Sequence, residues 1–240
     1  MKYFLIIPFT LLLASFAWSN DKKLIAAIFY IEPFGYKNQD GKISGATSDI
    51  IKAIENVSDI KIHQVILPYK RMIEFLKTGE VDFAIFFRSK LSDTITESVI
   101  PLYDLRTVVV GRKGTKITSY DDIYDIKLAT PLGVQYKPRL DDDKQLKITY
   151  VHDYDSAILM LQHKHVDAII SPEKILSYQL KKLGLKTDIL GESYILTTNT
   201  AWLQFSKNSK NKQYIDVLKS SVKLLKKENM INKVLDSYFH

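Results

Sequence analysis

Short apolar runs alternate along the chain with segments of helical periodicity, and this alternation constrains the fold most. Leu24 to Tyr30 is a short apolar run typical of a buried strand, Val81 to Phe87 reads as another buried strand, and Lys61 to Leu67 alternates like a strand. Two apolar helical faces lie between these strands. The first comprises Ile50, Ile51, Ile54 and Val57, with Thr47, Ser48 and Asp49 available as caps. The second comprises Met72, Ile73 and Leu76, in a helix that stops at Gly79. Strands that alternate with helices predict parallel sheets in an α/β fold.

The second half of the chain repeats this pattern. Ala157, Ile158 and Leu161 share one helical face and are followed by a predicted strand at Val166 to Ile170. A helix, a Val-Asp pair and a strand thus occur in the same order twice, and the two aspartates, Asp82 and Asp167, stand 167 − 82 = 85 residues apart. A repeat at this distance favours two similar lobes over a short-period solenoid.

The first 19 residues have the features of a secretory signal peptide. Lys2 supplies a positive charge, Tyr3 to Phe16 is almost entirely apolar, and Ala17-Trp18-Ser19 offers small residues at a cleavage site. The alternative is a membrane anchor, but the stretch is short for a span of about 20 residues and contains Pro8. We expect cleavage near Ser19 and an exported, soluble mature protein.

Composition excludes several kinds of chemistry. The 240 residues include no cysteine, which rules out disulfides, thiolate metal sites and cysteine nucleophiles. The net charge of +7 comes from scattered residues, and no basic patch interleaved with aromatics suggests nucleic-acid binding. Nucleotide-binding glycine motifs and a serine nucleophile elbow are absent, and the histidine spacing does not favour a metal pair. We expect no metal and no cofactor.

Aromatic and charged side chains follow the predicted strands. In open α/β sheets, ligands bind at the carboxyl ends of the strands, so these side chains could converge on one cleft. The alternative is that the rings belong to the core and the arginines to a solvated surface. The residues concerned are Tyr30, Glu32 and Phe34 after the first strand, Tyr69 and Arg71 at the start of a helix, and Phe87, Arg88 and Ser89 after the strand that begins near Val81.

Motifs spread over Leu24 to Phe239 give the chain a resemblance to bacterial extracellular solute-binding protein family 3, the periplasmic receptors of amino-acid-type ABC importers. Their order and spacing carry the resemblance, since none is specific by itself. They are Glu32-Pro33-Phe34-Gly35-Tyr36, Asp40-Gly41-Lys42-Ile43-Ser44-Gly45, Leu76-Lys77-Thr78-Gly79-Glu80-Val81-Asp82, Pro101-Leu102-Tyr103, Ser119-Tyr120-Asp121-Asp122-Ile123, His165-Val166-Asp167-Ala168 and Asp236-Ser237-Tyr238-Phe239.

The resemblance implies two Rossmann-like α/β lobes joined by two crossover strands, with the ligand cleft between the lobes. Lobe one would comprise residues 21–110 and 198–240, and lobe two residues 111–197. Tyr69 matches the family's aromatic that stacks on the ligand, and Ser89 matches a hydroxyl-bearing position after a lobe-one strand. Gly133 matches a lobe-two glycine whose turn faces the ligand, and Gln135 lies beside it.

The chain departs from the family where charged groups hold an amino acid. The arginine that binds the ligand carboxylate falls on Thr94, and the two acids that bind the ammonium fall on Ile28 and Pro172. A buried unpaired charge is costly, so other groups must replace them. Arg88 or Arg71 could take the carboxylate, and Glu173 or Glu32 a cationic group. This departure implies an amino-acid-like or carboxylate-bearing ligand in a non-standard pose.

The expected function is therefore that of a periplasmic, monomeric binding protein that captures a small polar solute for an ABC permease and catalyses no reaction. One alternative is a periplasmic dehydratase on the same fold, for which Glu173 is the candidate general acid. Another is a ligand-binding partner of a sensory receptor. The full set of expected ligand-binding residues is Tyr30, Glu32, Phe34, Tyr69, Arg71, Phe87, Arg88, Ser89, Gly133, Gln135 and Glu173.

Overall fold

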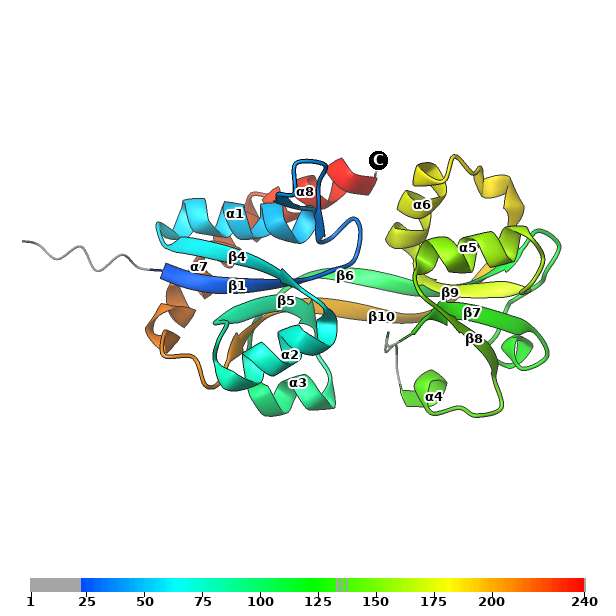
Figure 1. The fold of residues 1–240 in the computed structure, drawn as a ribbon, viewed down its shortest axis with the longest axis horizontal. Helices are drawn as coiled ribbons and strands as arrows, with labels where there is room; N and C mark the ends of the chain where they lie inside the picture. The colour runs from blue at the N-terminus through cyan, green and yellow to red at the C-terminus, as the bar shows by residue number, and fades with distance from the viewer. Residues whose placement is uncertain (1–22, 133, 135, 137, 240) are drawn as a thin grey trace, which may run out of the picture.

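One large sheet runs the whole length of the computed structural model, which describes residues 23–132, 134, 136 and 138–239. The expected signal peptide, Gly133 and Gln135 lie outside these residues. In spatial order the strands are β4 (Lys61–Leu67), β1 (Lys23–Phe29), β5 (Phe83–Phe87), β10 (Leu190–Ser206), β6 (Thr96–Arg112), β9 (Ala168–Pro172), β7 (Lys127–Pro131) and β8 (Lys147–Val151), as Figure 1 shows.

The sheet contains two parallel groups that share one topology. In the first, β1 pairs in parallel with β4 and β5; in the second, β7 pairs in parallel with β8 and β9. The antiparallel strands β6 and β10, 17 residues each, pair with one another and connect the two groups. The predicted α/β fold with two lobes and two crossover strands is thus confirmed, while the residue limits of the lobes stay a prediction.

Helices cover both faces of each parallel group. In the first lobe, Figure 1 places α1 and α8 on one face and α2 and α3 on the other. A two-stranded ribbon, β2 (Tyr36–Lys37) and β3 (Ile43–Ser44), precedes α1. The helices are α1 (Ala46–Ser58), α2 (Tyr69–Thr78), α3 (Lys90–Ile95), α7 (Ile215–Lys227) and α8 (Met230–Phe239) in lobe one, and α4 (Pro138–Asp141), α5 (Tyr154–Gln162) and α6 (Glu173–Lys182) in lobe two. Short 3-10 turns span Asp121–Ile123 (η1), Thr187–Ile189 (η2) and Lys212–Tyr214 (η3).

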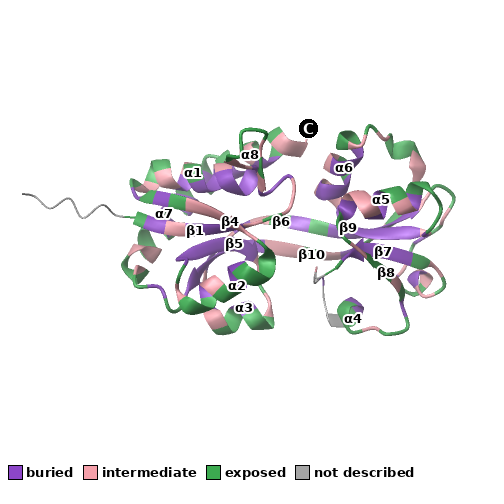
Figure 2. Cartoon of the chain, viewed as in Figure 1, coloured by how far each residue is buried: buried purple, intermediate pink, exposed green. Residues whose placement is uncertain are grey.

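Strand β1 shows why the sheet needs helices on both sides. Leu24, Ala26 and Ile28 point to the face covered by α1, whereas Ala27 points to the face covered by α2. Residues two apart in a strand share a face, so an uninterrupted apolar run buries both faces of the sheet. Figure 2 shows the buried strands between partly exposed helices. Within the described residues, no helix is long and apolar enough to cross a membrane.

One helix end agrees with the sequence-based expectation and another differs from it. Helix α2 stops where predicted, because Gly79 adopts a left-handed conformation at φ 82° that favours glycine. Helix α1 begins after Gly45, which makes no side-chain cap hydrogen bond, so the expected capping by Thr47, Ser48 or Asp49 is wrong. These three residues lie inside the first turn of α1 instead.

Parts of the predicted apolar faces and one strand boundary also differ. Val57, expected on the apolar face of α1, is exposed because it lies at the edge of the buried face of that helix. Val217 and Leu224 are exposed in the same way at the edge of the buried face of α7. The strand expected at Val166 to Ile170 is β9 and runs to Pro172, which then serves as the residue before α6.

Candidate functional site

Tyr69 is the most prominent aromatic at the carboxyl ends of the lobe-one strands. Strand β4 ends at Leu67, and Pro68 turns the chain so that Tyr69 begins α2. The ring lies edge-on to Phe29 and Phe86, at centroid distances of 5.8 and 6.4 Å. Burial raises the pKa of the Tyr69 hydroxyl. Tyr69 is nevertheless 39% exposed, so its ring is both fixed in position and accessible to a ligand.

Ser89 follows β5 and caps the short helix α3. Its hydroxyl oxygen accepts a hydrogen bond from Ser92 N at 3.1 Å, and Ser92 Oγ accepts one from Ser89 N at 2.8 Å. A serine hydroxyl has one donor and two acceptor positions. Ser89 can therefore hold the helix end and still donate to a ligand.

Arg88 already has partners in its own lobe. Its Nε and Nη2 donate to the two carboxylate oxygens of Asp93, each at 3.1 Å, and the guanidinium lies 5.4 Å from the Trp202 ring centroid. The hydrogen bond with Asp93 raises the pKa of Arg88. A bound anion would have to share this guanidinium with Asp93.

Arg71 forms no ion pair within the part of the chain that the structure describes. Its guanidinium lies 5.2 Å from the Phe75 ring centroid, on the exposed side of α2. Of the two arginines expected to bind an anion, Arg71 is thus the less committed to protein partners.

Tyr30, which follows β1, is 60% exposed and is a surface side chain.

The structure packs Phe34 into the core of lobe one. It is 4% exposed, stacks on Tyr103 at 6.0 Å and contacts Phe239 at 5.5 Å. Phe87 is half-buried and packs against the same core. The two phenylalanines therefore contribute to the core of lobe one, and Phe34 presents almost no surface to a ligand.

The two candidate acids are both engaged in ion pairs. Glu32 Oε2 lies 2.6 Å from Lys182 Nζ, and Glu173 Oε2 lies 2.6 Å from Arg106 Nη2. Glu32 belongs to the segment after β1 in lobe one, whereas Lys182 ends α6 in lobe two. The sequence predicted neither cation as a partner. Glu32 and Lys182, for example, are separated by 150 residues, so no local pattern indicates their contact.

A chain of hydroxyl groups lies at the carboxyl ends of the lobe-two strands. Thr130 Oγ1 and the Tyr136 hydroxyl are 2.6 Å apart, and the Tyr136 and Tyr154 hydroxyls are 3.2 Å apart. Burial raises the pKa of Tyr136 to about 12. Sequence reasoning missed this buried cluster, although Thr130 directly precedes the end of β7. Gly133 and Gln135, expected nearby, lie outside the described residues.

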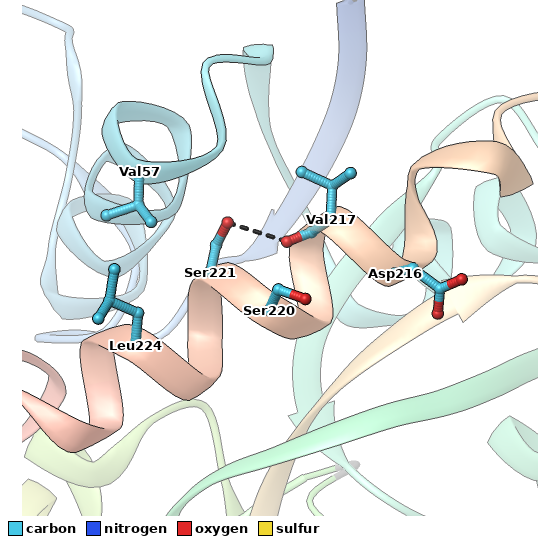
Figure 3. Close-up of a pocket in the computed structure, with 6 residues that line it drawn as sticks. All are labelled: Val57, Asp216, Val217, Ser220, Ser221 and Leu224. Carbon is cyan, nitrogen blue, oxygen red and sulfur yellow. Dashed lines mark hydrogen bonds between the residues drawn. The ribbon is translucent and has the colours of Figure 1, made fainter.

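Two surface hollows are lined by other residues. The first, of about 390 Å³, lies between α1 and α7 (Figure 3) and is lined by Val57, Asp216, Val217, Ser220, Ser221 and Leu224. The second, of about 360 Å³, lies beside the crossover strands and is lined by Pro101, Leu102, Tyr103, Asp104, Thr200, Trp202 and Lys226. Neither contains a residue expected to bind the ligand. Among the described residues, no cluster of three or more His, Asp or Glu could hold a metal ion.

Comparison with known proteins identifies a matching family and two named relatives. The model of the family "Bacterial extracellular solute-binding proteins, family 3" matches residues 25–240. A Bacillus subtilis (strain 168) protein named "Probable amino-acid-binding protein YxeM" is 23% identical over 87% of this chain and 80% of its own length. A Campylobacter jejuni "Probable histidine-binding protein" is 25% identical over 59% of this chain and 56% of its own length.

Solved structures share the same architecture. The GluR0 ligand-binding core from Nostoc punctiforme in complex with L-glutamate has a TM-score of 0.74 at 20% identity, covering 90% of this chain and 99% of that one. A mutant of ArgBP from T. maritima has a TM-score of 0.73 at 18% identity, covering 91% and 95%. An ancestral amino-acid-binding protein described as a precursor of cyclohexadienyl dehydratase has a TM-score of 0.71 at 18% identity, covering 91% and 96%. At these identities the likeness shows the fold.

Proposed function

This chain belongs to the bacterial extracellular solute-binding proteins, family 3, and we propose that it captures a small amino-acid-like or carboxylate-bearing solute for an ABC importer. The observation that carries the proposal is the family match over residues 25–240, which spans both parallel strand groups and both crossover strands. The names of the relatives support an amino-acid-like ligand, since two of them are named as probable amino-acid-binding or histidine-binding proteins.

The proposed site lies where the strand ends of the two lobes face one another, and the lobes close on the solute by a hinge motion of the crossover strands. Lobe one, residues 21–110 and 198–240, provides Tyr69 as the stacking ring and Ser89 as a hydroxyl donor. Arg71, which makes no ion pair among the described residues, and Arg88, held by Asp93, are the candidates for the ligand's carboxylate. An arginine fork can hold a carboxylate through two hydrogen bonds.

Lobe two, residues 111–197, completes the proposed site with Gly133 and Gln135. Glu32 and Glu173 are the acids available for a cationic group, but each is already neutralised by a basic partner. A ligand ammonium would have to compete with Lys182 or Arg106 for them. This supports a ligand whose recognised charge is mainly the carboxylate.

Catalysis as a dehydratase is less well supported than binding. Glu173 Oε2 lies 2.6 Å from Arg106 Nη2, so the carboxyl group that would have to act on a substrate is already engaged by a protein side chain. We therefore propose that the protein acts as a binder. We also propose that it works outside the cytoplasm, in keeping with the extracellular family, after removal of residues 1–19.

A thermal-shift screen of the purified protein tests the proposed ligand class. Amino acids, organic acids, polyamines and short peptides are compared at equal concentration, because a ligand of the folded state stabilises it by RT ln(1 + [L]/Kd), about 2.7 kcal/mol at 100 times Kd. We expect the largest rise in Tm from a carboxylate-bearing compound. A rise with polyamines alone would contradict the proposal.

A further inference from the structure

Helix α6 belongs to lobe two, yet both of its ends contact lobe one. Its last residue, Lys182, reaches the segment after β1, and Lys174 in its first turn reaches α8. Ile175, also in its first turn, is 2% exposed and packs within the main hydrophobic cluster of lobe one. Figure 1 shows α6 and α8 as neighbours on the same face of the sheet.

Lys182 links three elements through its ammonium group. Its Nζ donates to Glu32 Oε2 at 2.6 Å and to Asp155 Oδ2 at 3.2 Å. The hydrogen bond to Glu32 makes the largest contribution to raising the pKa of Lys182. The second oxygen of Asp155, Oδ1, is buried and has no hydrogen-bond partner among the described residues, so Lys182 is the group that compensates this carboxylate. The ammonium therefore connects Asp155 of lobe two to Glu32 of lobe one.

Lys174 forms a second contact between the lobes. Its Nζ lies 3.6 Å from Asp236 Oδ1 and 5.0 Å from the centroid of the Phe239 ring, both on α8. An ammonium is attracted both to a carboxylate and to the face of an aromatic ring. The two lysines thus act from opposite ends of the same helix on two separate parts of lobe one.

From this arrangement we propose that α6 carries an ionic clasp, formed by Lys182 on Glu32 and Lys174 on Asp236, which holds the two lobes together before any solute binds. A single half-exposed ion pair contributes little to stability. Two such pairs and a buried isoleucine acting across one hinge shift the balance between open and closed forms, since these differ by only a few kcal/mol in typical two-state proteins. The clasp concerns the ligand-free protein, so it does not depend on which solute the proposed site accepts.

Small-angle scattering of the purified ligand-free protein tests the clasp. Glu32→Gln and Lys182→Met each remove the charge attraction with little change in side-chain length. We expect both variants to have a larger radius of gyration than the parent protein. Raising the salt from about 0.05 to 1 M should expand the parent in the same direction, because the Debye length falls to about 3 Å at 1 M. The same change should expand the variants less, because only the pair of Lys174 with Asp236 remains to be screened in them. The salt series uses the parent protein alone, so it decides the question even if a variant folds poorly.

Lys52→Met is the matched control. It removes the ion pair of Lys52 with Asp49, 2.8 Å apart within α1, and so deletes the same charge without touching the contact between the lobes. Its radius should equal that of the parent. A parent radius that is insensitive to salt, together with unchanged radii in Glu32→Gln and Lys182→Met, would overturn the clasp. That result would leave the proposed solute binding intact, because ligand-induced shifts in Tm are measured separately.

Discussion

The Asp82 carboxylate accepts a hydrogen bond from the backbone N–H of Ile25 at 2.7 Å, across 57 residues of sequence. Asp82 N in turn donates to Ile25 O at 2.8 Å. Asp82 therefore satisfies both the backbone N–H and the backbone carbonyl of Ile25, at the start of the parallel pair β1 and β5. In lobe two, Asp167 contacts Lys127 in the same way, with distances of 3.0 Å to its N and 2.8 Å to its O. The repeated Val-Asp pair is therefore a strand-joining device used once in each lobe.

Removing the Asp82 carboxylate is expected to destabilise the protein more than removing that of Asp167. Asp82 is buried and also accepts hydrogen bonds from Ser209 Oγ and Asn211 Nδ2, so Asp82→Ala leaves several donors without an acceptor. We expect a loss of about 3 kcal/mol in the free energy of unfolding. Asp167 is partly exposed, and we expect Asp167→Ala to cost about 1 kcal/mol. Urea unfolding measures both, and equal losses would contradict this assignment.

Gln204 of β10 is expected to be essential for stability, because its side chain bonds to residues of β5 and β6. It is 0% exposed, its Nε2 donates to the carbonyl oxygens of Phe86 and Phe87 at 3.1 Å each, and its Oε1 accepts from Thr96 Oγ1 at 2.9 Å. Gln204→Leu should cost about 3 kcal/mol, since it leaves buried polar groups unpaired. The same change at exposed Gln213 should cost within about 0.5 kcal/mol in the same unfolding assay.

Tyr69 is expected to stack on the ligand. With the ligand found by thermal shift, Tyr69→Ala should weaken binding by about 2 kcal/mol, the free energy of burying an aromatic ring. Tyr69→Phe keeps the ring and should bind almost as tightly as the parent. Isothermal titration calorimetry measures both, and unchanged affinity in Tyr69→Ala would place the ligand elsewhere.

At least one of the two candidate arginines is expected to hold the ligand carboxylate. Arg71→Ala or Arg88→Ala should weaken binding by roughly 2–5 kcal/mol if the removed guanidinium pairs with a buried carboxylate. Thr94→Ala, at the position where the family's arginine falls, should change little, because the Thr94 hydroxyl donates to Leu91 O within α3. If both arginine variants bind as tightly as the parent, the recognised group is not an anion at this site.

Asp122 is expected to contribute to stability only while it is ionised. Its carboxylate accepts from Thr118 N at 2.7 Å and Ser119 N at 2.9 Å, and these backbone hydrogen bonds lower its pKa. A carboxyl with a lowered folded-state pKa stabilises the fold above its unfolded pKa of about 3.9, and this contribution is lost as the pH falls through the folded pKa. Asp122→Asn should therefore be less stable than the parent at pH 7, with the difference shrinking below about pH 4. A difference independent of pH would refute this role.

Much of the fold follows from local patterns. Largely apolar runs predicted β1 and β5, because burial on both faces of a parallel sheet demands them, and an alternating pattern predicted β4. Gly79 predicted the end of α2, because a left-handed residue suits glycine. The Val-Asp repeat indicates two lobes. These features depend on backbone conformation and side-chain burial, both of which leave a periodic signature in sequence.

The partners of the candidate side chains required the tertiary structure. The sequence placed Glu32, Arg88 and Phe34 near the strand ends, but it did not indicate their partners. In the structure these are Lys182 for Glu32, Asp93 for Arg88 and the Tyr103 ring for Phe34. An ion pair such as Glu32 with Lys182 leaves no periodic signal, because it joins residues 150 positions apart. The sequence by itself determined which residues form strands, helices and buried faces. Only the packing of one lobe against the other decided which charges meet, since charge pairing depends on distance in space.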